Sequence, residues 1–281
     1  NIADLSEQDL RALVRKILDG KIHGISFSPY VEGQGPGTQI GEAQIRERLA
    51  FIQPYVNWIR TFSCSEGNEL IPAIAAENGL KTMVGVWLDD NREQNEIEIA
   101  NAIEIANAGH ADILGVGNEV LLRGDLSEDE LIDYVNRVKD ATSGIPVGYV
   151  DAYFEFEVHP RITEACDVIL ANCYPFWEGC PADHALLYMK EMYRRAQNAS
   201  GGKPVIISET GWPNIGTPTD GAVPSLENAI KYFVDTCQWA EQDGIEIFYF
   251  SSFDETWKVD AEGDVGAYWG LWDKDGNLKY V

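Results

Sequence analysis

Hydrophobic and polar positions along the chain alternate between two periods. Runs rich in β-branched and aromatic residues, typical of buried strands, recur from end to end. They span residues 22–28, 57–63, 80–88, 111–119, 146–151, 167–175, 204–212 and 246–255. Between these runs, apolar residues recur every three or four positions, which is the period of a helix with one buried face. The pattern therefore predicts strands and helices in strict alternation.

Several of the helical segments carry their own start and stop signals. Ser127 and Glu130 form a capping-box pattern ahead of an apolar face. The segment EIEIANAIEIANAG at residues 96–109 begins with a two-residue alternation, but its length and its alanines favour a helix. An extra helix at about residues 6–19 precedes the first strand, with a cap at Ser6 and a stop near Gly20.

Eight strand-and-helix units without a linker or a compositional break predict an α/β fold, a (β/α)8 TIM barrel. We expect it to form a single domain over residues 1–281. The alternative is an open doubly wound sheet. The glycine-rich stretches at residues 33–37 and 115–117 lack the spacing of a nucleotide-binding loop, which leaves that alternative without support.

Composition narrows the functional classes. The chain has 46 acidic and 21 basic residues, a formal charge of −25, which argues against nucleic acid and anionic membranes and favours a neutral or cationic substrate. It contains no apolar run long enough to span a membrane. The five cysteines include no CxxC pair, so neither a disulfide framework nor a zinc site is expected, although one bridge involving Cys180 stays open. The GxSxG and HExxH motifs of serine and metal hydrolases are absent.

The carboxyl ends of the strands are where a TIM barrel carries its reactive side chains. Glu119 and Glu209 follow the fourth and seventh strand runs and can converge across the barrel mouth. Two opposed carboxyl groups are what glycoside hydrolysis requires. Arg60 and Tyr174, also at strand ends, would keep one of them ionised. The aromatic residues at the same rim suit the flat faces of sugar rings.

Each of these residues also has a simpler interpretation. A glutamate after a strand is more often a helix-cap neighbour or a surface ion-pair partner, and a rim aromatic more often covers the core. Arg60 alone is compatible with a buried structural pair. The coincidence of all of them at one end of the barrel favours a catalytic site.

Two segments, GVGNEV at residues 115–120 and ISETGWP at residues 207–213, resemble glycoside hydrolase family 17, the β-1,3-glucanases. Further segments match its bacterial and fungal members, so that the resemblance covers nearly the whole chain. These segments are GISFSPY, GQGPGTQ, WIRTFS, VGNEVLLRGDLS, CYPFWEG, SETGWPNIG, FDETWK and EGDVGAYWGLW.

The resemblance implies a retaining double displacement in which Glu119 is the general acid and base and Glu209 the nucleophile. It implies that Asn118 holds the sugar 2-hydroxyl and that Tyr174 orients Glu209. Retention requires the two carboxyl groups to lie about 5–5.5 Å apart. The other residues expected to bind substrate are Tyr30, Arg60, Trp212, Phe253, Glu255 and Lys258; Glu262 aligns only loosely with a further family glutamate.

The resemblance also implies no metal or organic cofactor, a neutral β-glucan as substrate and a monomer. The expected location is secreted, periplasmic or in the cell envelope, with any signal peptide absent or removed, since residues 1–10 have no basic start or apolar stretch.

The family pattern leaves the type of activity open. The segment CYPFWEGCPADHALL lacks the insertion of plant members, which indicates a shorter groove and leaves endo, exo and transfer action undecided. We expect a β-1,3-glucan hydrolase. The rivals are a transglycosylase that uses the same covalent intermediate, a β-1,4-specific barrel glycosidase and a non-catalytic glucan-binding barrel.

Overall fold

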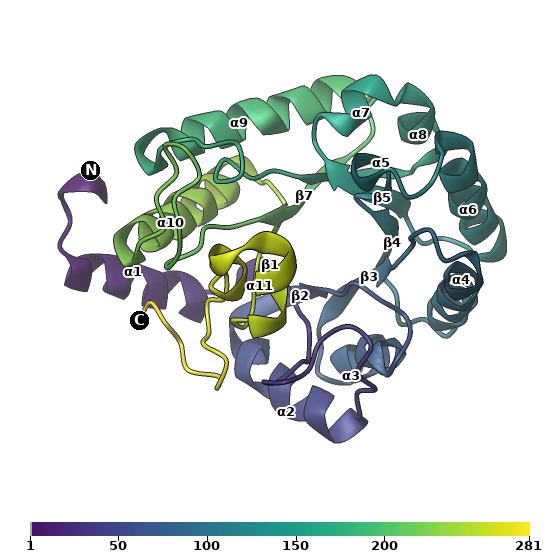
Figure 1. Cartoon of the computed structure of the whole chain (residues 1–281), viewed down its shortest axis with the longest axis horizontal. Helices are drawn as coiled ribbons and strands as arrows, with labels where there is room; N and C mark the ends of the chain where they lie inside the picture. The colour runs from purple at the N-terminus through teal and green to yellow at the C-terminus, as the bar shows by residue number, and fades with distance from the viewer. Residues whose placement is uncertain (1) are drawn as a thin grey trace.

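The strands of the computed structural model, which describes residues 2–281, close into one parallel barrel (Figure 1). Each strand pairs with its sequence neighbours, and β1 pairs with β8 to complete the ring. The strands are β1 (Ile22–Ser26), β2 (Val56–Arg60), β3 (Lys81–Val86), β4 (Ile113–Asn118), β5 (Val147–Ala152), β6 (Val168–Asn172), β7 (Val205–Thr210) and β8 (Ile247–Tyr249). The predicted (β/α)8 barrel is confirmed, and the open doubly wound sheet is excluded.

Most strands are shorter than the apolar runs that predicted them. The largest difference is at β8, where the run covers residues 246–255 but the strand only Ile247–Tyr249. Phe250 and Phe253 beyond it are 7% and 2% exposed. Because the chain continues to bury side chains after it leaves the sheet, hydrophobicity alone overestimates the strand.

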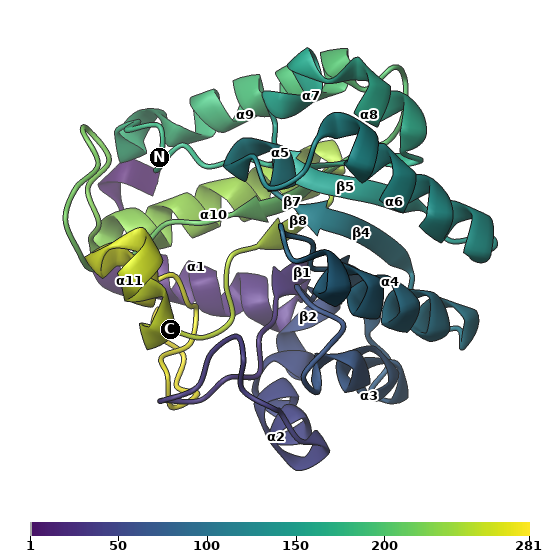
Figure 2. The ribbon, with the colours of Figure 1, turned by 45° about the vertical axis from the view of Figure 1, so that its right-hand side comes forward.

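Helices surround the barrel, and three short helices follow strand ends at its mouth (Figures 1 and 2). The surrounding helices are α1 (Glu7–Asp19), α2 (Glu42–Ile52), α3 (Ile71–Glu77), α4 (Arg92–Asn107), α6 (Glu128–Ala141), α8 (Pro160–Ala165), α9 (Ala182–Ala199) and α10 (Leu226–Asp243). The short helices are α5 (Val120–Arg123), α7 (Glu155–Val158) and α11 (Val259–Glu262). Turns of 3₁₀ helix span Ile2–Asp4, Gln53–Tyr55, Asn68–Leu70, Thr256–Lys258 and Asp264–Ala267.

The predicted helix signals are confirmed. Ser127 and Glu130 form the capping box of α6, and residues 96–107 belong to α4. The extra helix α1 begins after Ser6, ends at Gly20 and packs against α10 (Figures 1 and 2). It therefore packs beside the helix that precedes β8, the strand that pairs with β1 to complete the ring.

Apolar side chains form three buried clusters. One cluster, in which Met83, Leu170 and Phe248 are fully buried, is contributed by strands alone. Two larger clusters combine strand and helix residues.

All five cysteines are free thiols, so the bridge involving Cys180 that the sequence left open is not formed. Within residues 2–281, no helix has the length and apolar character needed to cross a membrane.

Candidate active site

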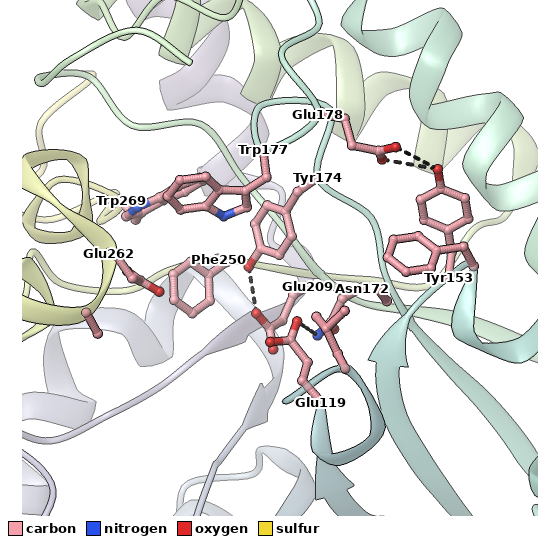
Figure 3. Close-up of a pocket in the computed structure, with 14 residues that line it drawn as sticks. Glu119, Tyr153, Asn172, Tyr174, Trp177, Glu178, Glu209, Phe250, Glu262 and Trp269 are labelled. Carbon is pink, nitrogen blue, oxygen red and sulfur yellow. Dashed lines mark hydrogen bonds between the residues drawn. The ribbon is translucent and has the colours of Figure 1, made fainter. Parts of the chain in front are cut away.

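Glu119 and Glu209 lie where two cavities meet at the carboxyl ends of the strands (Figure 3). The larger cavity, of about 650 Å³, extends from these residues over β1 to β4. The smaller, of about 540 Å³, extends over β5 to β7. Both carboxyl groups line both cavities, so a chain that occupies the two cavities must pass over them.

Glu209 is held by two donors, Tyr174 just after β6 and Arg60 at the end of β2. Its side chain, on β7 and 7% exposed, accepts a hydrogen bond of 2.6 Å from the Tyr174 hydroxyl at Oε1 (Figure 3). The Arg60 guanidinium, 1% exposed, forms an ion pair with Oε2 and donates through its other terminal nitrogen to Asn118 Oδ1 at 2.8 Å. Donors on both oxygens fix the orientation of the carboxyl group.

Glu119 has a different environment. Burial, and then the charge of Glu209, raise its pKa, while a hydrogen bond of 3.1 Å from the Asn172 side-chain amide to Oε1 opposes the rise (Figure 3). Glu209 is thus paired with the Arg60 cation, whereas Glu119 has a raised pKa. This asymmetry is what a pair of carboxyls needs when one attacks as an anion and the other donates a proton.

The sequence interpretation missed Asn172. It ends β6, directly beside Glu209 in the paired register, and its Oδ1 accepts a hydrogen bond of 2.7 Å from Ser208. This bond fixes which way the amide faces, so that its NH₂ group points to Glu119. A signal was present, because Asn172 ends its strand as Asn118 ends β4.

The smaller cavity is walled by aromatic rings, of which the sequence singled out only Tyr174. They are Tyr153, Phe154, Tyr174, Trp177, Phe250 and Trp269 (Figure 3). Trp177 is 40% exposed and lies against Trp269, with ring centroids 5.5 Å apart. Phe250 lines both cavities between the two carboxyl groups and the loops after β8. The rings offer apolar faces of the kind on which sugars stack.

The larger cavity gathers three of the predicted contact residues, Tyr30, Asn118 and Lys258. Glu255 lies behind them, only 6% exposed, and forms an ion pair of 3.0 Å with Lys258. Lys258 Nζ in turn lies 4.1 Å from the centre of the Phe250 ring. Glu255 therefore acts on the cavity through Lys258.

Two predicted contacts with substrate are wrong. Trp212 is 1% exposed, donates to the Val223 carbonyl at 3.0 Å and packs against Phe176. Phe253 is 2% exposed and lies beneath the guanidinium of Arg48 at 3.7 Å. Both rings belong to the core, because the chain turns inward after β7 and β8 instead of crossing the rim. Arg60 is also too deeply buried to reach a sugar, so its contribution passes through Glu209 and Asn118.

Glu262, which the sequence aligned only loosely, lines both cavities (Figure 3). Burial raises its pKa to about 7, against the opposing charge of Lys258, and nearby Glu209 adds to the rise. Its Oε2 is buried and has no hydrogen-bond partner among the described residues. Across residues 2–281, no three His, Cys, Asp or Glu side chains are arranged to hold a metal ion.

Comparison with known proteins gives consistent matches over most of the chain. Residues 24–270 match the family model of the BtgE/BtgC glycoside hydrolase domain. The glucan 1,3-β-glucosidase BGL2 of Candida albicans is 30% identical over 259 residues, 83% of each protein. A glucan 1,3-β-glucosidase of Saccharomyces cerevisiae is 27% identical over 270 residues, covering 87% of this chain and 86% of the yeast protein.

Among solved structures, a glycoside hydrolase family 17 β-1,3-glucanosyltransferase from Rhizomucor miehei superposes with a TM-score of 0.82. It is 32% identical and covers 93% of this chain and 96% of its own. An active-site mutant of the Rhizomucor enzyme, solved in complex with laminaritriose, matches equally well.

Proposed function

Because the chain belongs to glycoside hydrolase family 17, with the BtgE/BtgC glycoside hydrolase domain, we propose that it cleaves β-1,3-glucan with retention of configuration. The substrate follows from the relatives, which are named as glucan 1,3-β-glucosidases and as a β-1,3-glucanosyltransferase. The single observation that carries the proposal is the placement of Glu119 and Glu209 at the junction of two cavities, in opposite electrostatic environments.

In the first step Glu209 attacks the anomeric carbon while Glu119 donates its proton to the glycosidic oxygen. The bond between carbon and oxygen breaks, its electron pair stays with the leaving oxygen, and a glycosyl ester forms on Glu209. Tyr174 and Arg60 hold the attacking carboxylate in the orientation that this requires. The raised pKa of Glu119 keeps the proton available to higher pH than in an ordinary glutamate.

In the second step Glu119, now ionised, takes a proton from the incoming hydroxyl group. That oxygen attacks the anomeric carbon, and the electron pair of the ester bond returns to Glu209. Asn172 donates to Glu119 and so stabilises the carboxylate that exists between the two steps. The sugar attached to Glu209 would lie toward Asn118 in the larger cavity, which leaves the smaller cavity to the leaving group and the acceptor.

The acceptor decides between hydrolysis and transfer. Hydrolysis is our first proposal. Transfer is the second candidate, because the rings of the smaller cavity would hold an acceptor sugar against the intermediate, and the Rhizomucor relative is a glucanosyltransferase. Incubation with laminaripentaose separates the two: products no longer than the pentamer support hydrolysis, whereas hexamers and longer chains identify transfer.

Glu209→Gln tests whether the site is catalytic at all. The variant should lose at least about 10³-fold in kcat on laminarin, since it lacks the nucleophile. Glu246→Gln is the matched control, because Glu246 is exposed and precedes β8 at the opposite end of the barrel. Undiminished turnover by Glu209→Gln would refute the mechanism. If the wild-type protein itself binds glucan but does not cleave it, the protein is a glucan-binding barrel. Parallel assays on mixed-linkage glucan and cellulose test the linkage.

A further inference from the structure

Glu119 sits in a turn that its own backbone does not favour. Its φ and ψ angles are 54° and 31°, in the left-handed region, and Gly117 just before it has a φ of 87°. A residue with a side chain rarely adopts this conformation unless its surroundings impose it. The turn aims Glu119 into the barrel mouth, so whatever holds the turn also sets the position of its carboxyl group.

The backbone supplies part of this support. The N–H of Glu119 donates to the Val150 carbonyl at 2.8 Å, and its carbonyl accepts from the N–H of Arg123 at 2.9 Å. These two bonds tie the residue to β5 on one side and to α5 on the other. They leave the carbonyl of Asn118, at the start of the turn, available to another donor.

The side chain of Arg123 is that donor. One terminal nitrogen donates to the Asn118 carbonyl at 2.6 Å and the other to the Leu88 carbonyl at 3.2 Å. Its Nε pairs with Asp125 at 2.8 Å, which fixes the plane of the guanidinium. A planar group with donors in a fixed fork can join two carbonyls in this way, whereas a lysine ammonium holds neither direction.

The same guanidinium lies over the ring of Trp87, 4.8 Å from its centre. Trp87 and Arg123 both line the larger cavity, beside Asn118 and Glu119. Arg123 thus joins the loop after β3 to the turn after β4, and none of its hydrogen bonds goes to Glu119 or Glu209.

We propose that Arg123 is a positioning residue that holds the turn of Asn118 and Glu119 and thereby places the acid and base carboxyl group. The inference rests on the proposed role of Glu119 in glycoside cleavage. Arg123 acts through the backbone of the turn, because its nitrogens bond to the Asn118 and Leu88 carbonyls and to Asp125. Its loss should therefore impair the steps that need Glu119 and spare those that do not.

Leaving groups of different acidity give this test. A 2,4-dinitrophenyl β-laminaribioside needs no protonation to leave, while laminari-oligosaccharides do. Arg123→Gln should lose roughly 10–100-fold in kcat/KM on oligosaccharides, the scale expected for a misplaced catalytic group, and less than about threefold on the dinitrophenyl substrate. An equal loss on both substrates overturns the proposal, as does no loss on either.

Azide gives a second readout that general damage to the fold would not move. The azide anion attacks the glycosyl ester without giving up a proton, so it bypasses Glu119 as base, and the product is a glycosyl azide. Azide should raise the turnover of Arg123→Gln on the dinitrophenyl substrate and leave that of the wild-type enzyme unchanged. Absence of this rescue contradicts the proposal.

Three further variants make the result specific. Arg123→Lys keeps the charge but not the fork, and should recover only part of the loss on oligosaccharides. Arg92→Gln is the matched control, since Arg92 bonds to Asp89 and Glu130 on the same side of the molecule, and it should behave as wild type. Glu209→Gln separates the two levels of inference: if it is inactive while Arg123→Gln matches wild type, only the positioning role fails; if it remains active, the proposed function fails.

Discussion

The side-chain amide of Asn172 donates a hydrogen bond to Glu119, at 3.1 Å, from the strand that pairs with the one carrying Glu209. Ser208 holds the opposite end of the same amide at 2.7 Å. Ser208 thus orients the amide of Asn172, and the amide donates to Glu119 and opposes the rise of its pKa that burial and the charge of Glu209 cause. The relationship makes Asn172 a natural subject for mutation.

Asn172→Ala should lower kcat/KM on laminari-oligosaccharides by about 10-fold, because a donor to the ionised carboxyl group is worth roughly 1.5–3 kcal/mol, of which water restores part. The pKa of Glu119 should rise further without this donor, which moves the basic limb of the pH profile to higher pH. Asn107→Ala, which removes a bond to the Ala141 carbonyl on the surface, is the control. A basic limb that stays in place would show that Asn172 does not act on Glu119.

The basic limb of the wild-type pH profile on oligosaccharides should report the ionisation of Glu119. The residue must be protonated in the first step, and burial together with the charge of Glu209 raises its pKa. Activity on oligosaccharides should thus persist above about pH 4.3, the usual pKa of a glutamate, and fall only when Glu119 ionises. On the dinitrophenyl substrate the first step should lose this basic limb. A decline on oligosaccharides centred at or below about pH 4.3 would contradict the role of Glu119 as the acid.

Trp212→Phe should reduce the free energy of unfolding by about 1–3 kcal/mol, because it removes a buried hydrogen bond and leaves a void among packed rings. KM for laminari-oligosaccharides should not change. Denaturant unfolding and steady-state kinetics measure the two effects. Trp177→Ala is the complementary variant, since Trp177 is exposed in the smaller cavity, and it should raise KM with little loss of stability. A raised KM without a loss of stability in Trp212→Phe would show instead that Trp212 contacts the sugar.

Glu262→Gln should stabilise the protein at high pH. Burial raises the pKa of Glu262 to about 7 in the folded state, so ionisation opposes folding. Relative to the variant, the wild-type chain loses nothing below about pH 4, loses stability progressively as pH rises toward 7, and then stays lower by roughly 3–4 kcal/mol. Urea unfolding at pH 4 and pH 8 gives the comparison. Equal differences at the two pH values would mean that folding does not raise the pKa of Glu262.

The order of strands, the barrel and the two catalytic candidates followed from the sequence, for reasons of local chemistry. The spacing of apolar residues indicates a strand or a helix wherever one face of the element is buried. Capping residues such as Ser6 and Ser127 bond to backbone groups only a few positions away, so they too can be recognised in the sequence. Glu119 and Glu209 stood out because each follows an apolar run that must be buried, at the strand ends where a barrel carries its chemistry.

Tertiary structure alone decided which rim residues face a cavity. Trp212 and Tyr174 both follow strands, yet one is buried against Phe176 and the other reaches Glu209, because the loops after neighbouring strands turn in different directions. Asn172 bonds to Glu119 and Arg123 bonds to Leu88 across parts of the chain that are far apart in sequence, and hydrophobic periodicity carries no record of such contacts. The sequence thus determined which groups are available, and the closing of the barrel determined their neighbours, their burial and hence their acidity.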